Sequence, residues 1–282
     1  MRVEPFFDEH SGTLTYVVDD GRTGVVIDPV RDFDLSWGRT SWRSAEKIAA
    51  YIDSERLQIR YVIDTHAHAD HFSGIPFFRE RYGAQSVTGV RIAEVQERLG
   101  TVLDLGGDSA AAGSPFDVLL DEGKLLRFGQ LEIEAMHTPG HTPEHMSWRI
   151  QESVFVGDTL LMPDCGSARC DFPGGSADQL FHSIQRLYRL ADDTRLYVGH
   201  DARPGGRPLA FQTTVAEQKG RNVHIRPSTT ESDFLALRNE ADARSPGSPL
   251  LLLAPQVNLR AGEFPEPAAN GTRYLKLPID AL

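Results

Sequence analysis

The chain has 282 residues, of which 40% are hydrophobic and 24% charged, and its formal net charge is −11. This composition is typical of a globular protein with a sizeable apolar core, and the length suits a single domain over residues 1–282. The acidic charge argues against nucleic acid and against anionic membrane surfaces as partners, because both require a basic face on the protein.

The N-terminal half alternates short apolar runs with helical patterns. MRVEPFFDEH lacks the apolar run of a secretory signal, and no stretch reaches the ~20 apolar residues that cross a bilayer, so we expect a cytoplasmic protein. TLTYVVDD and TGVVIDPV predict a β-hairpin around a glycine-containing turn. SAEKIAAYIDSERL, GIPFFRERYGA and RIAEVQERLG predict helices, the last two ending at glycine, and IRYVIDT predicts a buried strand. Residues 101–115 predict a surface loop near the entrance to the site.

The C-terminal half begins with strand patterns and continues with helices. LEIEAMH, HMSWRI, SVFVGD and TRLYVGH predict strands. SADQLFHSIQRLYRL and STTESDFLALRNEADA each begin with a capping-box pattern, Ser176 with Gln179 and Ser228 with Glu231, and PLAFQTTVAEQKG predicts a helix through about Lys219. We expect residues 225–282 to be a C-terminal helix and tail packed on the main body. The alternation of elements predicts helices that cover a sandwich of two sheets.

Metal-binding side chains follow four of these apolar runs. They occur in THAHADH, TPGH, VFVGD and YVGH, and loops at strand ends can hold such side chains in fixed geometry. Imidazole and carboxylate suit zinc, iron and manganese. Five of the ten histidines fall in this ordered series, which makes a chance match improbable. The ligand residues are His66, His68, Asp70, His71, His141, Asp158 and His200.

The spacing leaves the number of metal ions open. His66 and His68 are two residues apart, so in an extended segment their side chains point the same way. Asp70 and His71 then reach a neighbouring position, and Asp158 could bridge two ions. Seven ligand residues therefore permit either one metal or two.

The series THAHADH, TPGH, GD and GH resembles the metallo-β-lactamase superfamily as far as His200. This resemblance implies an α/β fold, an αββα sandwich of two mixed β-sheets flanked by helices, with the metal site at one edge. FVGDTLLMPDCGSARCDFPGG, TTVAEQKGRNVHI and QVNLRAGEFPEPAANGTRYLKLPI are in addition similar to the bacterial persulfide dioxygenases, and this similarity covers nearly the whole chain.

The narrower resemblance implies an enzyme with one Fe(II) per chain, held by the catalytic residues His66, His141 and Asp158. Two imidazoles and one carboxylate leave positions for substrate and O2, whereas zinc has no redox chemistry. The implied reaction oxidises glutathione persulfide with O2 and water to sulfite and glutathione. The remaining ligand residues would orient water and ligands by hydrogen bonds or hold a second metal; they are His68, Asp70, His71 and His200.

The carboxylates of glutathione call for cations in the pocket, because arginine binds carboxylates bidentately. Arg169 is the first choice for this substrate-binding role, ahead of Arg260 and Lys276, and each of the three could instead form a structural ion pair.

Four further residues near the motifs are neither predicted metal ligands nor predicted substrate contacts. Cys165 and Cys170 are expected to be reduced thiols. Cys165 stands where related sequences carry tyrosine, and Glu144 and His145 stand where they carry small residues or cysteine. We interpret His145 as a residue that forms hydrogen bonds near the site.

Two other readings compete with the dioxygenase. A dinuclear zinc hydrolase, similar to glyoxalase II, could use all seven ligand residues to cleave a glutathione thioester or a lactone. A persulfide-binding module without activity would need a damaged ligand set, and no ligand residue is missing. A homodimer is the default expectation for the assembly.

Overall fold

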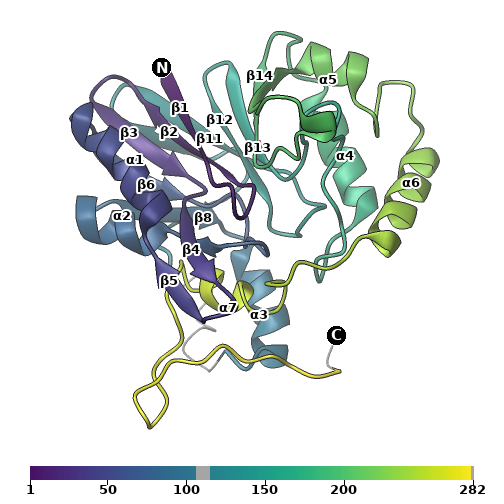
Figure 1. Ribbon diagram of the computed structural model, residues 1–282. Coiled ribbons are helices and arrows are strands. Elements are labelled where there is room, and N and C mark those ends of the chain that lie inside the picture. Colours follow the sequence, from purple (N-terminus) through teal and green to yellow (C-terminus); the bar gives the residue numbers. More distant parts are fainter. Residues whose placement is uncertain (106–114, 281–282) are drawn as a thin grey trace. The chain divides into compact units, whose positions relative to one another are not determined.

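A computed structural model describes residues 1–105 and 115–280. The chain separates into two compact units, of which the first comprises residues 1–4, 15–120 and 247–282 and the second residues 5–14 and 121–246. Each unit is built on a mixed β-sheet with helices against it (Figure 1).

The sheet of the first unit has the strand order β1-β2-β3-β6-β8-β9. The predicted hairpin is confirmed, since β2 and β3 pair antiparallel, while β3 with β6, β6 with β8 and β8 with β9 pair parallel. The predicted strand IRYVIDT is β6, and its last three residues are fully or nearly fully buried. The strands are β1 (Arg2–Phe7), β2 (Leu14–Asp19), β3 (Thr23–Ile27), β6 (Gln58–Ile63), β8 (Gln85–Gly89) and β9 (Val118–Leu120).

The helices predicted for this unit are α1 (Arg43–Ser54), α2 (Ile75–Tyr82) and α3 (Ile92–Val102). Apolar side chains at i, i+3, i+4 spacing bury one side of α1. Gly83 ends α2 in the left-handed conformation, as predicted. The predicted stop of α3 at Gly100 is wrong, because the buried Leu99 and Leu103 carry the helix past this glycine.

A small sheet in the order β5-β4-β7 adjoins the histidine motif. Phe72, which directly follows the motif, packs with Ala254 and Val257 in a buried cluster. The C-terminal segment is thus packed against the residue that directly follows the last histidine of the motif. The elements are β4 (Val30–Asp34), β5 (Arg39–Ser41), β7 (Phe72–Ser73) and α7 (Pro255–Asn258).

The sheet of the second unit has the strand order β10-β11-β12-β13-β14-β15. Its strands pair antiparallel except for β13 with β14, which pair parallel. Trp148 and Phe155 pair across β12 and β13 in the core. The strands are β10 (Leu125–Phe128), β11 (Leu131–His137), β12 (Met146–Ile150), β13 (Ser153–Gly157), β14 (Arg195–Val198) and β15 (Gln212–Thr214).

The helices of the second unit are α4 (Ala177–Leu187), α5 (Val215–Arg221) and α6 (Glu231–Arg244). The predicted cap of α4 is confirmed, since the Ser176 hydroxyl accepts from the backbone N–H of Gln179 at 3.3 Å. For α6 the predicted cap at Ser228 is wrong: Thr230 accepts from the N–H of Asp233. The helix expected through Lys219 begins only at Val215, because residues 212–214 pair with β14 as a strand.

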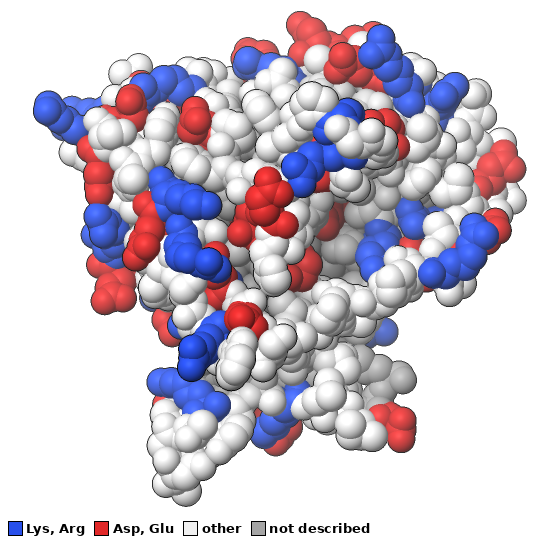
Figure 2. All heavy atoms as spheres, viewed as in Figure 1, with Lys and Arg blue, Asp and Glu red and all other residues white. Residues whose placement is uncertain are grey.

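These elements confirm the predicted α/β class with mixed sheets. Most of the predicted loop at 101–115 lies outside the described residues, and the single domain with a packed tail over 225–282 stays a prediction. Among the residues described, no helix combines the length and the apolar character needed to cross a bilayer. Figure 2 shows acidic and basic side chains interspersed over the face in view.

Candidate metal centre

In the first unit, the loop after β6 gathers three buried imidazoles. The ring centroids of His66 and His68 lie 4.1 Å apart, and those of His68 and His71 lie 4.2 Å apart. His68, Asp70 and His71 each offer a ligand atom within 4.8 Å of the others. The expectation that THAHADH concentrates metal-binding atoms in one place is therefore met within this unit.

A hydrogen-bond chain determines which nitrogen of His66 could bind a metal. The Thr65 hydroxyl donates its only proton to the Asp28 carboxylate at 2.9 Å. The same oxygen lies 2.9 Å from Nδ1 of His66 and must therefore accept a proton from it. With Nδ1 protonated, the lone pair of the neutral His66 ring is on Nε2.

His68 is oriented by the same carboxylate. Its Nε2 lies 3.1 Å from Oδ1 of Asp28, whereas its buried Nδ1 has no hydrogen-bond partner in the part of the chain that the structure describes. Metal-binding histidines have this arrangement: one ring nitrogen is hydrogen-bonded to a carboxylate, and the other is available to the metal. Burial lowers the pKa of His68, but the charges of Asp28 and Asp64 outweigh it and raise the pKa to about 10, so a metal ion bound at Nδ1 would have to displace a proton.

Asn258 holds the motif from the C-terminal segment. Its side-chain amide donates to the backbone carbonyls of His68 at 2.7 Å and His71 at 2.8 Å, and its carbonyl accepts from the N–H of Ser73 at 2.8 Å. Neither Asp28 nor Asn258 was predicted from the sequence to be a functional residue. The available signal for Asp28 was its position, since it directly follows an apolar strand as Asp64 and Asp158 do.

In the second unit, three further ligand residues converge at the ends of strands. Oδ2 of Asp158 lies 3.6 Å from Nε2 of His141 and 3.5 Å from Nε2 of His200. These distances are too long for hydrogen bonds. Two ligand atoms bound tetrahedrally at about 2.0–2.1 Å from one ion lie about 3.4 Å apart, so the spacing suits a metal.

Backbone carbonyls determine which ring nitrogen carries the proton in His141 and in His200. Nδ1 of His141 donates to the carbonyl of Arg169 at 2.7 Å, and Nδ1 of His200 donates to the carbonyl of Gly12 at 3.0 Å. A carbonyl oxygen can only accept, so in each neutral ring the lone pair is on Nε2, which is the atom nearest Asp158. The residues present therefore fit a bound metal ion.

His145 supports Asp158 from behind and is not oriented as a ligand. Its Nε2 accepts from the backbone N–H of Asp158 at 3.0 Å, and its Nδ1 lies 3.1 Å from the Thr138 hydroxyl. Gly199 leaves room for the carboxylate, because a Cβ at this position would lie 2.5 Å from Oδ1 of Asp158. The hydrogen-bonding role expected for His145 is thus what the structure gives it.

Comparison with known proteins decides the family. A family model described as the metallo-β-lactamase superfamily matches residues 10–200, more than half of the chain. The chain belongs to the metallo-β-lactamase superfamily. The predicted fold is thereby confirmed.

Individual members of the superfamily differ in their names. A probable metallo-hydrolase of Burkholderia pseudomallei (strain 1710b) is 44% identical and covers 100% of both chains. Glyoxylase B2 of Dictyostelium discoideum is 39% identical, with 100% of this chain and 97% of that one covered. The human mitochondrial persulfide dioxygenase ETHE1 is 28% identical, with 91% and 87% covered. The crystal structure of ETHE1 from Myxococcus xanthus has a TM-score of 0.75 and 29% identity, covering 93% of this chain and 100% of that one.

The three cationic side chains expected to bind substrate already form ion pairs or hydrogen bonds within the protein. The Arg169 guanidinium pairs with Asp171 and donates to the carbonyl of Pro246 at 2.8 Å, while its own carbonyl fixes His141. Arg260 donates to the carbonyl of Leu105, and Lys276 pairs with Asp104. Their substrate-binding role stays a prediction.

The two cysteines are free thiols, as expected. Burial and the neighbouring Asp242 raise the pKa of Cys170 to about 12, against a smaller opposing effect of Arg238. Burial likewise raises the pKa of Cys165. Neither side chain is a thiolate at neutral pH, so neither has the character of a nucleophile.

Proposed function

We propose that the chain is an Fe(II)-dependent persulfide dioxygenase whose single iron is bound by His66, His141 and Asp158. The observation that carries this proposal is the hydrogen bonding of the rings. In both histidines Nδ1 donates its proton to a fixed acceptor, so each offers Nε2 as a ligand, and a carboxylate lies beside one of them. Two imidazoles and one carboxylate form the ligand set of non-haem iron oxygenases.

A ferrous ion held there would supply the redox chemistry that joins dioxygen to sulfur. In the overall reaction the S–S bond of glutathione persulfide breaks and glutathione leaves as a thiol. The terminal sulfur receives two oxygen atoms from O2 and one from water and leaves as sulfite. The chain's own part is to hold the three ligand residues in position by hydrogen bonds. Thr65 orients His66, the Arg169 carbonyl orients His141, and His145 fixes the backbone of Asp158.

The relatives support this proposal through the human persulfide dioxygenase ETHE1 and the Myxococcus xanthus protein that shares the name ETHE1. The structure of the Myxococcus xanthus protein matches 93% of this chain, and the human protein matches 91%. The match extends past residue 200, where the superfamily model ends, into the C-terminal segment that contributes Asn258.

A hydrolase is a second candidate, favoured by a different observation. Oδ2 of Asp158 lies 3.5 Å from Nε2 of His200 and 3.6 Å from Nε2 of His141, so this oxygen could also bridge two ions, each bound by one of the histidines. The relative with 44% identity is also named a probable metallo-hydrolase. Two zinc ions at such a site would activate water for cleavage of a glutathione thioester or a lactone.

Metal analysis combined with two assays distinguishes the candidates. Protein purified without added metal is analysed for iron and zinc, then tested for oxygen uptake and sulfite release with glutathione persulfide, and for hydrolysis of S-lactoylglutathione. The dioxygenase predicts one iron per chain and sulfite formed in proportion to O2 consumed. Two zinc ions per chain with thioester hydrolysis and no oxygen uptake would refute it.

Variants of two ligand residues distinguish a site with one metal ion from a site with two. With a single ion bound by His66, His66→Ala should remove the iron, whereas His200→Ala should retain it. A dinuclear site predicts that both variants lose metal. His10→Ala, an exposed histidine outside the ligand series, is the matched control.

The remaining parts of the proposal concern partners and location. We propose glutathione persulfide and O2 as the small molecules bound, with Arg169, Arg260 and Lys276 as candidate contacts to glutathione. A homodimeric state and a cytoplasmic location complete the proposal. Sedimentation analysis tests the first, and fractionation of the source cells tests the second.

A further inference from the structure

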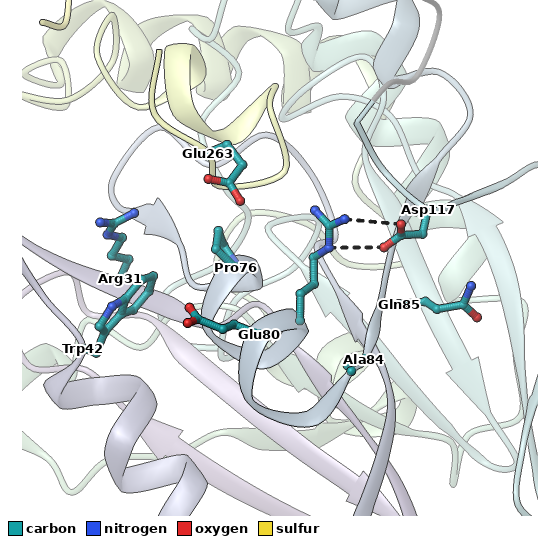
Figure 3. A pocket seen from close by; sticks show the side chains of 10 residues that line it. Arg31, Trp42, Pro76, Glu80, Ala84, Gln85, Asp117 and Glu263 are labelled. Carbon is teal, nitrogen blue, oxygen red and sulfur yellow. Dashed lines mark hydrogen bonds and ion pairs between the residues drawn. The ribbon is translucent and has the colours of Figure 1, made fainter. Parts of the chain in front are cut away.

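The first unit contains an open cavity of about 640 Å³ that none of the metal-ligand residues lines (Figure 3). Its size falls within the range of small-molecule sites. The charged side chains at its wall come from β4, from α2, from the residue that precedes β9, and from the C-terminal segment. They are Arg31, Arg79, Glu80, Asp117 and Glu263.

Arg31 is held rigidly at this wall. Its guanidinium carbon lies 4.3 Å from the ring centroid of Trp42 and 4.4 Å from that of Phe264. The two rings cover its faces, so only its edges can form hydrogen bonds. One edge donates to the Thr40 hydroxyl at 3.3 Å.

Within the described part of the chain, Arg31 has no carboxylate in direct contact. Its buried Nε has no hydrogen-bond partner, and it forms no ion pair within 4.0 Å, among residues 1–105 and 115–280. Burial lowers its pKa, the charge of Glu263 opposes this effect, and the charge of Arg273 adds to it. A half-buried cation without a counter-ion is costly, and a ligand carboxylate would offset that cost.

The other charged side chains of the cavity are one ion pair and two carboxylates. Arg79 pairs with Asp117 at 3.3 Å, so these two neutralise each other. Glu80 and Glu263 are exposed and take part in no ion pair within the described part of the chain. In the view of Figure 3, Glu80 and Glu263 lie between Arg31 and Asp117.

We propose that this cavity binds a small zwitterion that carries a free amine and a free carboxylate, namely an amino acid or a short peptide. Arg31 binds the carboxylate through its open edge, and Glu80 and Glu263 accept hydrogen bonds from the ammonium group. A simple dicarboxylate would meet two like charges, and a simple amine would leave Arg31 without a counter-ion. The site is independent of the proposed function, because it uses no residue of the metal centre.

The test uses one dipeptide and its two blocked forms. L-Alanyl-L-alanine should bind the full-length, metal-loaded protein in calorimetry or saturation-transfer NMR. N-acetyl-L-alanyl-L-alanine lacks the amine and L-alanyl-L-alanine amide lacks the carboxylate, so each should bind at least about tenfold more weakly. Equal binding of all three, or no binding of the dipeptide at millimolar concentration, overturns the proposal.

Variants show whether binding occurs at this cavity. Arg31→Gln should weaken dipeptide binding at least about tenfold. Because Arg31 also packs between two rings, Glu263→Gln serves as a second variant whose exposed side chain takes no part in folding, and it should weaken binding of the dipeptide but not of its N-acetyl form. Arg39→Gln, an exposed arginine on the neighbouring strand outside the cavity, is the control. Undiminished binding in Arg31→Gln or Glu263→Gln would show that the dipeptide binds elsewhere.

Discussion

Replacing His145 tests how the second unit holds Asp158 in position. His145 is fully buried, and its Nε2 accepts the backbone N–H of Asp158 at 3.0 Å. Leucine is similar in size but cannot accept, so His145→Leu leaves that N–H buried without this partner. Such a loss costs about 1–3 kcal/mol.

This free energy converts to a measurable change in melting temperature. For a chain of this size, 1 kcal/mol shifts the Tm by about 2–4 °C, so His145→Leu should lower it by about 2–12 °C. His145→Gln is the matched control, because its side-chain carbonyl reaches roughly as far from the backbone as Nε2 and can accept the same N–H. We expect the glutamine variant to recover much of the lost stability.

The same variants should separate in metal content. Without its backbone hydrogen bond the Asp158 loop is less fixed, so His145→Leu should purify with less metal than the wild type and His145→Gln with an amount closer to it. Scanning calorimetry and elemental analysis give the two readouts. If the leucine and glutamine variants melt at the same temperature and hold the same metal, the hydrogen bond to Asp158 is not what His145 contributes.

Three more predictions follow from the second unit. Arg207 donates to both oxygens of the buried Asp201 carboxylate, at 2.7 Å each, so urea unfolding at pH 7 should show Arg207→Met to be about 3–5 kcal/mol less stable. Burial alone raises the pKa of Asp201, but Arg207 and two backbone N–H groups lower it overall, so this stabilisation is present above about pH 4 and is lost as the pH falls further; a deficit in Arg207→Met that stays constant into acid contradicts this. Gly199→Ala would place a Cβ 2.5 Å from Oδ1 of Asp158, so elemental analysis should find reduced metal, and a full complement would show that the carboxylate can move aside. Iodoacetamide at pH 8 should label Cys170 about three orders of magnitude more slowly than an exposed cysteine, measured by mass spectrometry, because its pKa is about 12.

Local patterns were sufficient for most elements. The hairpin of β2 and β3, the strand β6 and the capped start of α4 depend on residues within a few positions of one another, so their signals lie in short stretches of sequence. The errors occur where tertiary contacts override such signals. Gly100 stays helical beside the buried Leu99, and residues 212–214 became a strand because β14 offers them hydrogen bonds.

The sequence by itself determined the superfamily and the candidate ligand residues, because each candidate follows an apolar run that becomes a strand and a strand end fixes where the next side chain lies. Only the tertiary structure decided which nitrogen of each ring can bind a metal. That choice depends on distant acceptors: Asp28 lies 40 residues from His68, and Gly12 lies 188 residues from His200. A hydrogen bond acts through space over about 3 Å, so its partner cannot be read from neighbouring positions in the chain.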